Sequence, residues 1–385
     1  MSWMTRIRGI IRADSGLAYV GLGSFITLAV GGLFWFILAS MLTAKDYGEL
    51  NYYISVASVS SVISMLGLST TVITYVAKGS KKIGSQANLA VLLSNAIGAV
   101  VLMIITNYYT SLLLVGMSFF SMTISETLGM KLYKKYFILL VAERATQIGL
   151  AIALYYAIGL QGVIIGYTLG ALTFSYSFFR SLRNISFDIS ELKSRFTFIL
   201  HNYAFNISDS LALHADKLII APVFGFTVLG FYQLGFQFLM VLSVIPASLF
   251  YYLLPQFSSG NKKRNVIYVA LILATLFASI APIIIPVLIN MFFRGYIEVI
   301  LTAQIMSIGI VPMTINSILN SSSLANGHSK NVLIGAIAYI SSLLILFYLL
   351  GTLVGVVGLG VAVVVSLSLQ SLVLFLMSRR YRLGP

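Results

Sequence analysis

The sequence predicts an all-α polytopic membrane protein, with 12 transmembrane helices in two six-helix lobes around a central cavity. Composition is the first reason: 59% of the 385 residues are hydrophobic and 9% are charged, with a mean hydropathy of +0.99. An average soluble domain has about 25% charged residues. The second reason is a series of twelve apolar stretches that reach the ~20 residues needed to cross a bilayer. The third is the alternating placement of basic residues between these stretches.

The apolar stretches follow one another without a large loop. The first comes after a basic amino-terminal segment and is about 25 residues long, longer than the apolar core of a secretory signal, so we expect a retained span. The longest connection, SLRNISFDISELKSR, separates the sixth stretch from the seventh. The predicted spans are 16–41, 48–76, 86–107, 110–130, 136–158, 161–180, 196–221, 228–254, 266–291, 297–325, 331–353 and 356–378.

Positive charge predicts the orientation. Of the 24 basic residues, 20 lie at the two termini and in every second connection, whereas the opposite connections hold only Lys45 and Arg294. Cytoplasmic loops retain an excess of lysine and arginine, so both termini are predicted to be cytoplasmic in a multi-pass protein of the cell (plasma) membrane. The net charge of +14 then reflects topology and contact with anionic membrane lipids, and we expect no nucleic-acid partner.

The two halves of the chain repeat each other at their turns. TAKDYGELNYY after the first span pairs with FTVLGFYQLG after the seventh, which places Gly48 and Gly230 in register. Six spans per copy give both copies the same orientation, as in carriers built from parallel repeats. The sequence therefore predicts an amino-terminal lobe (1–182), a cytoplasmic linker (183–195) and a carboxy-terminal lobe (196–385).

Prolines distinguish the halves. Proline removes a backbone donor and kinks a helix, which membranes tolerate where a neighbouring group replaces the lost hydrogen bond. We therefore expect the second lobe to be the bent one. Six of the seven prolines lie in spans seven to ten or at their ends: Pro222, Pro246, Pro255, Pro282, Pro286 and Pro312.

Span seven carries polar residues at membrane depth. Charged side chains there cost at least about 2.5–3.5 kcal/mol each, so they face protein or water. Two interpretations stay open, the wall of a water-filled cavity and an interhelical ion pair. Asp216 and Lys217 are adjacent and should point about 100° apart, so we do not expect them to be satisfied by each other alone. At 100° per residue one stripe holds Asn202, Asn206, Asp209 and Asp216, with Lys217 at its edge.

Span five holds Glu143 and Arg144. Arginine can bind two phosphate oxygens at once, which suits a diphosphate headgroup. The alternative is a salt bridge to an acid on a neighbouring helix, such as Glu126 or Asp209. Glu126 itself is expected in an interfacial ion pair beside Lys131.

Two further features are expected to serve packing. Gly162, Gly166 and Gly170 recur at four-residue spacing, and such a small-residue face lets helices approach closely. His214 is expected to be a hydrogen-bonded packing residue rather than a proton carrier.

Several motifs occur in a characteristic order. Span one ends in ASMLTAKDYGELNYY, and SMLGLSTTVITYVAKG comes next. SETLGMKLYKKY closes span four, and HADKLIIAPVFGFTVLGFYQLG joins spans seven and eight. ILNSSSLANGHSK closes span ten and LVGVVGLGVA begins span twelve. Along nearly the whole chain this order resembles the Wzx-type polysaccharide flippases, in the superfamily that includes multidrug extruders and lipid II flippases. The resemblance implies a flippase that carries a polyprenyl (di)phosphate-linked oligosaccharide from the cytoplasmic to the outer leaflet by alternating access.

Within this interpretation, polar residues of spans five and seven are the candidate substrate-binding residues. We expect no catalytic residue, metal site or cofactor, because cysteine is absent and no P-loop, G-x-S-x-G or H-E-x-x-H motif occurs. The expected partners are the lipid-linked oligosaccharide and membrane lipids, with glycan polymerase or glycosyltransferase proteins as further candidates. The substrate-binding candidates are Arg144, Lys217, Asp209, Asp216, Asn202, Asn206 and Glu143.

Two other functions stay open. One is a multidrug or metabolite cation antiporter of the same fold, against which Arg144 and Lys217 favour an anionic cargo. The other is a non-transporting partner in glycan assembly. Leaflet transfer of a lipid-linked sugar, efflux of an organic cation, or neither activity would separate the three functions.

Overall fold

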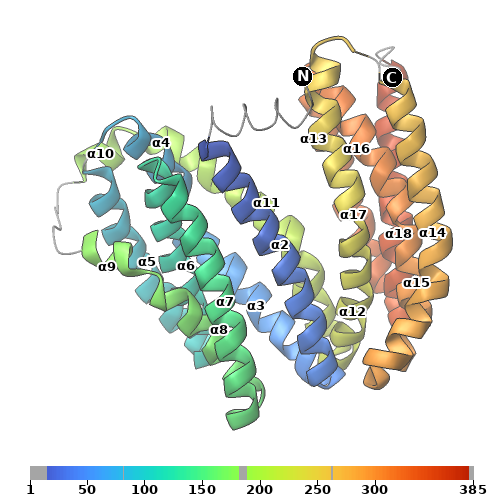
Figure 1. Ribbon diagram of the computed structural model, residues 1–385, viewed down its shortest axis with the longest axis horizontal. Helices are drawn as coiled ribbons and strands as arrows, with labels where there is room; N and C mark the ends of the chain where they lie inside the picture. Colours follow the sequence, from blue (N-terminus) through green and yellow to red (C-terminus); the bar gives the residue numbers. More distant parts are fainter. Residues whose placement is uncertain (1–14, 81, 182–188, 262, 381–385) are drawn as a thin grey trace, which may run out of the picture. The chain divides into compact units, whose positions relative to one another are not determined.

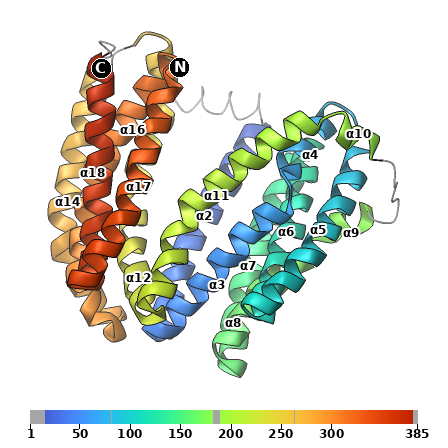
Figure 2. The ribbon, with the colours of Figure 1, turned by 180° about the vertical axis from the view of Figure 1, so that it is seen from behind.

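A computed structural model describes residues 15–80, 82–181, 189–261 and 263–380, and all regular secondary structure in these ranges is helical (Figures 1 and 2). The predicted all-α class is therefore confirmed. The amino-terminal basic segment and most of the predicted linker lie outside the described residues. The helices are α2 (Ser15–Met41), α3 (Ala44–Ser64), α4 (Leu68–Ala77), α5 (Ile83–Ile105), α6 (Tyr108–Gly129), α7 (Tyr133–Ile158), α8 (Leu160–Thr173), α9 (Tyr176–Ser181), α10 (Ser190–Lys193), α11 (Phe196–Phe224), α12 (Phe226–Leu242), α13 (Val244–Ser258), α14 (Arg264–Phe292), the 3-10 helix η2 (Arg294–Val299), α15 (Ile300–Ile308), α16 (Ile310–Ala325), α17 (Ser329–Val354) and α18 (Val356–Arg380).

The described residues contain 8 helical segments long and apolar enough to cross a membrane, or up to 10 if the bent pairs α3–α4 and α12–α13 each count as one span. Predicted span six falls on α8, whose 14 residues make it short, and on α9. Predicted span seven falls on α11, whose polar residues lower its hydropathy. Each predicted stretch is thus helical, the protein is a multi-pass membrane protein, and the number of twelve spans stays a prediction.

Internal contacts divide the chain into two compact units. The first unit is Met1–Phe34 with Tyr52–Leu218, and the second is Trp35–Asn51 with Ile219–Pro385. Helices α2, α3 and α11 each supply residues to both units. The lobes predicted from the sequence divide the chain at other positions, and they stay a prediction, as does the central cavity between them.

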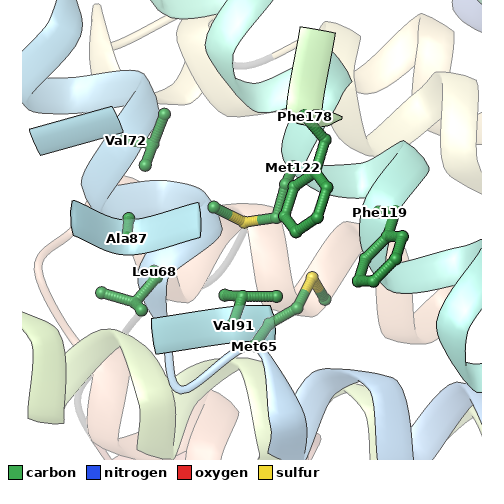
Figure 3. Close-up of a cluster of buried hydrophobic side chains, with 8 residues drawn as sticks. All are labelled: Met65, Leu68, Val72, Ala87, Val91, Phe119, Met122 and Phe178. Carbon is green, nitrogen blue, oxygen red and sulfur yellow. The ribbon is translucent and has the colours of Figure 1, made fainter. Parts of the chain in front are cut away.

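A hydrophobic cluster packs α4, α5, α6 and α9 of the first unit together (Figure 3). The rings of Phe119 on α6 and Phe178 on α9 stack with their centroids 4.1 Å apart. Such aromatic pairs add about 0.5–1.5 kcal/mol beyond the area that they bury. This contact holds the short helix α9 against α6. The cluster comprises Met65, Leu68, Val72, Ala87, Val91, Phe119, Met122 and Phe178.

Helices α7 and α8 pack along the predicted small-residue face. A Cβ atom at Gly162, Gly166 or Gly170 would overlap atoms of α7. Gly166, for example, faces the backbone of Ala151. The packing role predicted for these glycines is therefore confirmed.

The second unit contains a reciprocal contact between the two glycines that the repeat places in register. A Cβ at Gly48 would overlap the carbonyl oxygen of Phe226, and a Cβ at Gly230 would overlap that of Ala44. Ala44 and Phe226 are the first residues of α3 and α12, each four residues before its glycine. The two helices thus cross symmetrically, which matches the register of the predicted repeat.

Prolines lie inside helices α11, α13 and α14, as the sequence predicts for the second half of the chain. Pro286 has no N–H to donate to the carbonyl of Pro282 four residues earlier. The side-chain Nε2 of Gln304 on α15 donates to that oxygen instead, at 2.7 Å. A neighbouring side chain therefore restores the hydrogen bond that the proline removes.

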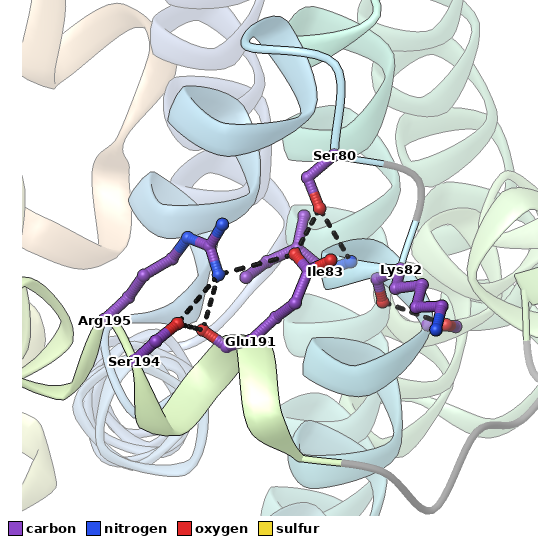
Figure 4. Close-up of polar contacts among 7 residues, drawn as sticks. Ser80, Lys82, Ile83, Glu191, Ser194 and Arg195 are labelled. Carbon is purple, nitrogen blue, oxygen red and sulfur yellow. Dashed lines mark hydrogen bonds and ion pairs between the residues drawn. The ribbon is translucent and has the colours of Figure 1, made fainter.

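Helix α10 is attached to the turn before α5 by polar contacts (Figure 4). The Ser80 hydroxyl donates to the Glu191 carboxylate, which also pairs with Arg195 at 3.4 Å. The Arg195 guanidinium lies 4.4 Å from the centre of the Tyr75 ring on α4. The described end of the predicted linker is therefore part of the first unit.

Candidate functional site

The site begins at the break between α3 and α4. Leu66 and Gly67 have positive φ angles of 54° and 73°, and the two helices differ in direction by 51°. A Cβ at Gly67 would lie 2.6 Å from the backbone nitrogen of Tyr203 on α11. The left-handed backbone and the close approach both require glycine here. The break therefore allows α11 to lie directly against the α3–α4 turn.

A cavity of about 360 Å³ lies beside this break, within the first unit. This volume falls in the range of about 300–1,000 Å³ that is typical of small-molecule sites. Helix α11 forms one wall. Its lining residues are Asn206, Asp209, Ser210, Leu213 and His214.

The remaining walls come from α3, α4 and α6. Their polar groups are serine hydroxyls, and their apolar groups are two methionines and a valine. Sulfur and aliphatic side chains of this kind offer an adaptable apolar surface. The lining residues are Ser58, Ser61, Val62, Met65, Ser69, Met117 and Ser121.

Several polar groups of the lining have no hydrogen-bond partner among the described residues. They are the side chains of Asn206, Asp209, Ser210, Ser69 and Ser121. Each can donate to or accept from a ligand, except that an ionised aspartate only accepts. The cavity thus offers free hydrogen-bonding groups within the first unit.

Other polar groups of the lining are already bonded. The Ser61 hydroxyl donates to the Ser58 carbonyl oxygen at 2.9 Å, and His214 Nδ1 lies 3.2 Å from Ser55 Oγ. The packing role predicted for His214 is confirmed by this contact. His214 also lines the cavity, which the sequence does not indicate.

Asp209 is the acidic residue of the lining, and no lysine or arginine of the described chain lines the cavity. Lys217, the basic residue of α11, pairs with Asp216 through Nζ and Oδ2 at 2.9 Å, and both side chains are buried. Lys217 Nζ also lies 3.4 Å from the Leu213 carbonyl oxygen. The long lysine side chain folds back, so the two adjacent residues meet despite the 100° between their Cβ directions.

Only part of the polar stripe predicted for span seven therefore lines the cavity. Asn206 and Asp209 line the cavity, whereas Asn202 donates to the Phe198 carbonyl oxygen of its own helix at 2.8 Å. Asp216 belongs to the buried pair. Sequence reasoning missed the serines, because small hydroxyl residues barely change the hydropathy of a span. The three-residue spacing of Ser58 and Ser61 is the signal that places them on one helix face.

Glu143 and Arg144 lie on α7 and do not line the cavity. Arg144 Nη1 donates to Gln147 Oε1 at 2.9 Å and lies 3.5 Å from the Tyr167 hydroxyl on α8. Its Nε is buried and has no hydrogen-bond partner among the described residues. No salt bridge from Arg144 to Glu126 or Asp209 exists in the described parts of the chain, so that alternative is wrong.

Glu126 also differs from its prediction. The Ser177 hydroxyl of α9 donates to Glu126 Oε2 at 2.7 Å. No ion pair with Lys131 forms between the described residues, so the predicted interfacial ion pair is wrong. The physical reason is the position of α9, which places a hydroxyl against the buried carboxylate.

In the described ranges, no group of three or more His, Cys, Asp or Glu side chains is arranged to hold a metal ion. The chemistry that the cavity offers is hydrogen bonding, a single carboxylate and an apolar surface.

Comparison with known proteins gives the family. Residues 37–309 match the model of the family described as "Polysaccharide biosynthesis protein". No curated protein sequence matches the chain. The matched residues include the α3–α4 break and all of α11.

Solved structures give the fold. A lipid II flippase, MurJ, in an inward closed conformation has a TM-score of 0.70 and 14% identity, with 93% of this chain and 87% of that chain covered. An inward-facing multidrug resistance MATE family transporter of the MOP superfamily has a TM-score of 0.69 and 13% identity, with 96% and 98% covered. An outward-facing MATE family transporter has a TM-score of 0.57 and 14% identity, with 96% of both chains covered. The resemblance read from the motifs is thus confirmed at the level of fold and family.

Proposed function

This chain belongs to the polysaccharide biosynthesis protein family, and on that premise we propose that it is a flippase. Its cargo is an oligosaccharide linked to a polyprenyl (di)phosphate, moved from the cytoplasmic to the outer leaflet of the cell membrane. The observation that carries the proposal is the cavity beside α11. Its Asn206 amide, its Asp209 carboxylate and three of its serine hydroxyls have no partner among the described residues.

The hydrogen-bonding groups replace water around the sugar. A buried polar group without a partner costs about 1–3 kcal/mol, so a cargo rich in hydroxyl groups is favoured over an apolar one. The lipid tail stays in the bilayer while the sugar crosses. The lobes 1–182 and 196–385 open alternately to the two sides, with both termini in the cytoplasm.

Arg144 is our candidate for contact with phosphate. Its guanidinium has a buried Nε without a partner in the described parts of the chain, and its bonded neighbours Gln147 and Tyr167 are uncharged. The planar guanidinium can bind two phosphate oxygens in parallel. Glu143, the preceding residue of α7, is buried and stays a candidate for cargo contact beside Arg144.

The other candidate residues have two roles, binding of the sugar and positioning of α11. Asn206 and Asp209 bind the sugar. Asn202, Asp216 and Lys217 position α11, through the bond to Phe198 and the buried ion pair.

Leaflet transfer in proteoliposomes tests the proposal. The full chain is reconstituted with a fluorescent lipid-linked sugar, and an impermeant reductant destroys the probe in the outer leaflet. A flippase makes the inner-leaflet probe accessible as well, whereas protein-free vesicles keep it protected. Folded, reconstituted protein that leaves the inner probe protected would contradict the proposal.

A cation antiporter is the second candidate, and one observation favours it: Asp209 lines the cavity and no lysine or arginine does. Efflux of an organic cation such as ethidium from the same vesicles would support it. Neither transfer nor efflux would favour a non-transporting partner of glycan polymerase or glycosyltransferase proteins.

A further inference from the structure

We infer that the cavity beside α11 selects a neutral sugar unit, one with hydroxyl or N-acetyl groups, and rejects a sugar that carries a carboxylate. This inference rests on the proposed function, because it names the class of sugar that the flippase accepts. It follows from the charge of the lining, from its hydrogen-bonding groups and from its size.

The first step concerns charge. Among the described lining residues, Asp209 is the single Asp, Glu, Lys or Arg. Its side chain has neither an ion pair nor a hydrogen bond with the described residues. Its side chain is exposed, as expected for a group that faces open space. An anionic sugar in this cavity would therefore meet a like charge.

The second step concerns compensation. Lys217 lies one helical turn from Leu213, but Asp216 pairs with it at 2.9 Å, so the pair adds no net charge beside the cavity. Arg144 lies on α7 among Gln147 and Tyr167 and does not line the cavity. Among the described residues, no basic side chain of the lining is thus available to offset the charge of an acidic sugar.

The third step concerns hydrogen bonds. An ionised carboxylate only accepts, so Asp209 needs donors, and sugar hydroxyls supply them. A carboxylate on the sugar is also acceptor-only and cannot bond to Asp209. Asn206 and the unpaired serine hydroxyls can both donate and accept, which matches the two roles of a sugar hydroxyl.

The fourth step concerns size and surface. The cavity volume of about 360 Å³ lies near the lower end of the range of about 300–1,000 Å³ that is typical of small-molecule sites, which suits a sugar unit rather than a whole oligosaccharide. Met65, Met117 and Leu213 provide apolar surface for the C–H face of a sugar ring. The inference therefore concerns one unit of the cargo, with the rest of the glycan outside this cavity.

Protection of a single cysteine tests the inference without a transport readout. The chain has no cysteine, so Leu213→Cys gives one thiol in the lining. The probes are short-chain polyprenyl diphosphates that carry a neutral hexose, the matching hexuronic acid, or the matching hexosamine. Each probe is titrated against alkylation of the full-length protein by a small neutral maleimide, with the sugar-free lipid as the control.

We expect the hexose probe to protect the thiol at a concentration at least about tenfold lower than the hexuronic acid probe, because like-charge juxtaposition is costly. Asp209→Asn in the same background should remove this difference. Ser208→Ala, a change at the exposed neighbour outside the lining, should keep it.

Four results would overturn the inference: equal protection by hexose and hexuronic acid, protection by neither, rejection that persists in Asp209→Asn, or strongest protection by the hexosamine. Leaflet transfer of the same probes reports the proposed function separately. If no probe is transferred, the flippase proposal fails, whatever the pattern of protection.

Discussion

At the scale of single residues, the site depends on which charges are already paired. Asp216 and Lys217 are 8% and 6% exposed and form an ion pair, whereas Asp209 has none in the described chain. The sequence places all three in one helix but cannot separate them, because helical geometry alone sets adjacent side chains about 100° apart. The length of the lysine side chain decides the outcome.

Lys217→Ala should therefore lower the amount of folded protein. The change leaves the buried Asp216 carboxylate without its ion-pair partner Lys217, and breaking a buried pair costs about 3–5 kcal/mol. The double change Lys217→Met with Asp216→Asn should restore accumulation, which size-exclusion chromatography of the solubilised protein measures. Normal accumulation of Lys217→Ala with lost transport would instead make Lys217 a cargo-binding residue.

Arg144→Lys should keep accumulation but lose most transport. The charge stays, while the planar fork that binds two phosphate oxygens is lost. Lys135→Arg, at an exposed position of the same helix, is the matched control and should change neither quantity. Unchanged leaflet transfer in Arg144→Lys would rule out the proposed phosphate contact.

At the scale of helices, the sequence locates the apolar stretches but not their breaks. The stretch 48–76 is one span by hydropathy, yet Leu66 and Gly67 divide it into α3 and α4. One glycine hardly changes the hydropathy of a window, so only the backbone shows the bend. The same holds for α8 and α9, which occupy a single predicted span. The cavity lies beside the first of these breaks, which is why its serine wall could not be predicted.

Gly67→Ala should destabilise the protein through the break. A left-handed conformation costs a non-glycine residue about 1–2 kcal/mol, and the added Cβ would also overlap the α11 backbone. Gly79→Ala is the matched control, since Gly79 has a φ of 91° with nothing within 4 Å. Thermal unfolding in detergent should show a larger loss for Gly67→Ala. Equal losses would mean that the close approach to α11 carries no cost.

Gln304→Leu should destabilise the second unit by about 1–3 kcal/mol, because it leaves the Pro282 carbonyl oxygen without its donor. Pro286→Ala restores a backbone N–H for the same oxygen. In a double-mutant cycle, Gln304→Leu should therefore cost less in the Pro286→Ala background than in the native chain. Additive effects on thermal unfolding would show that the two donors do not compensate each other.

At the scale of the whole molecule, apolar exposure and charge placement agree on a membrane protein. Large apolar side chains such as Ile104 and Leu353 are 79% and 78% exposed, a pattern that requires lipid rather than water around them. The orientation predicted from 20 of the 24 basic residues stays a prediction. Composition therefore predicts the class and the membrane, and motif order predicts the family. The polar lining of the cavity emerges only from the packing of α4, α6 and the first-unit parts of α3 and α11.

The central claim is that a water-filled cavity beside α11 holds the sugar of the cargo. Single cysteines at five positions of α11, labelled in membranes with a small water-soluble thiol reagent, test it most directly. Cysteines at Asn206, Asp209 and Leu213, which line the cavity, should react, and a lipid-linked hexose should protect them. Cysteines at Ile207 and Leu211, which do not line it, should react slowly with or without the hexose. Uniform labelling around the helix, or no protection at the three lining positions, would contradict the account.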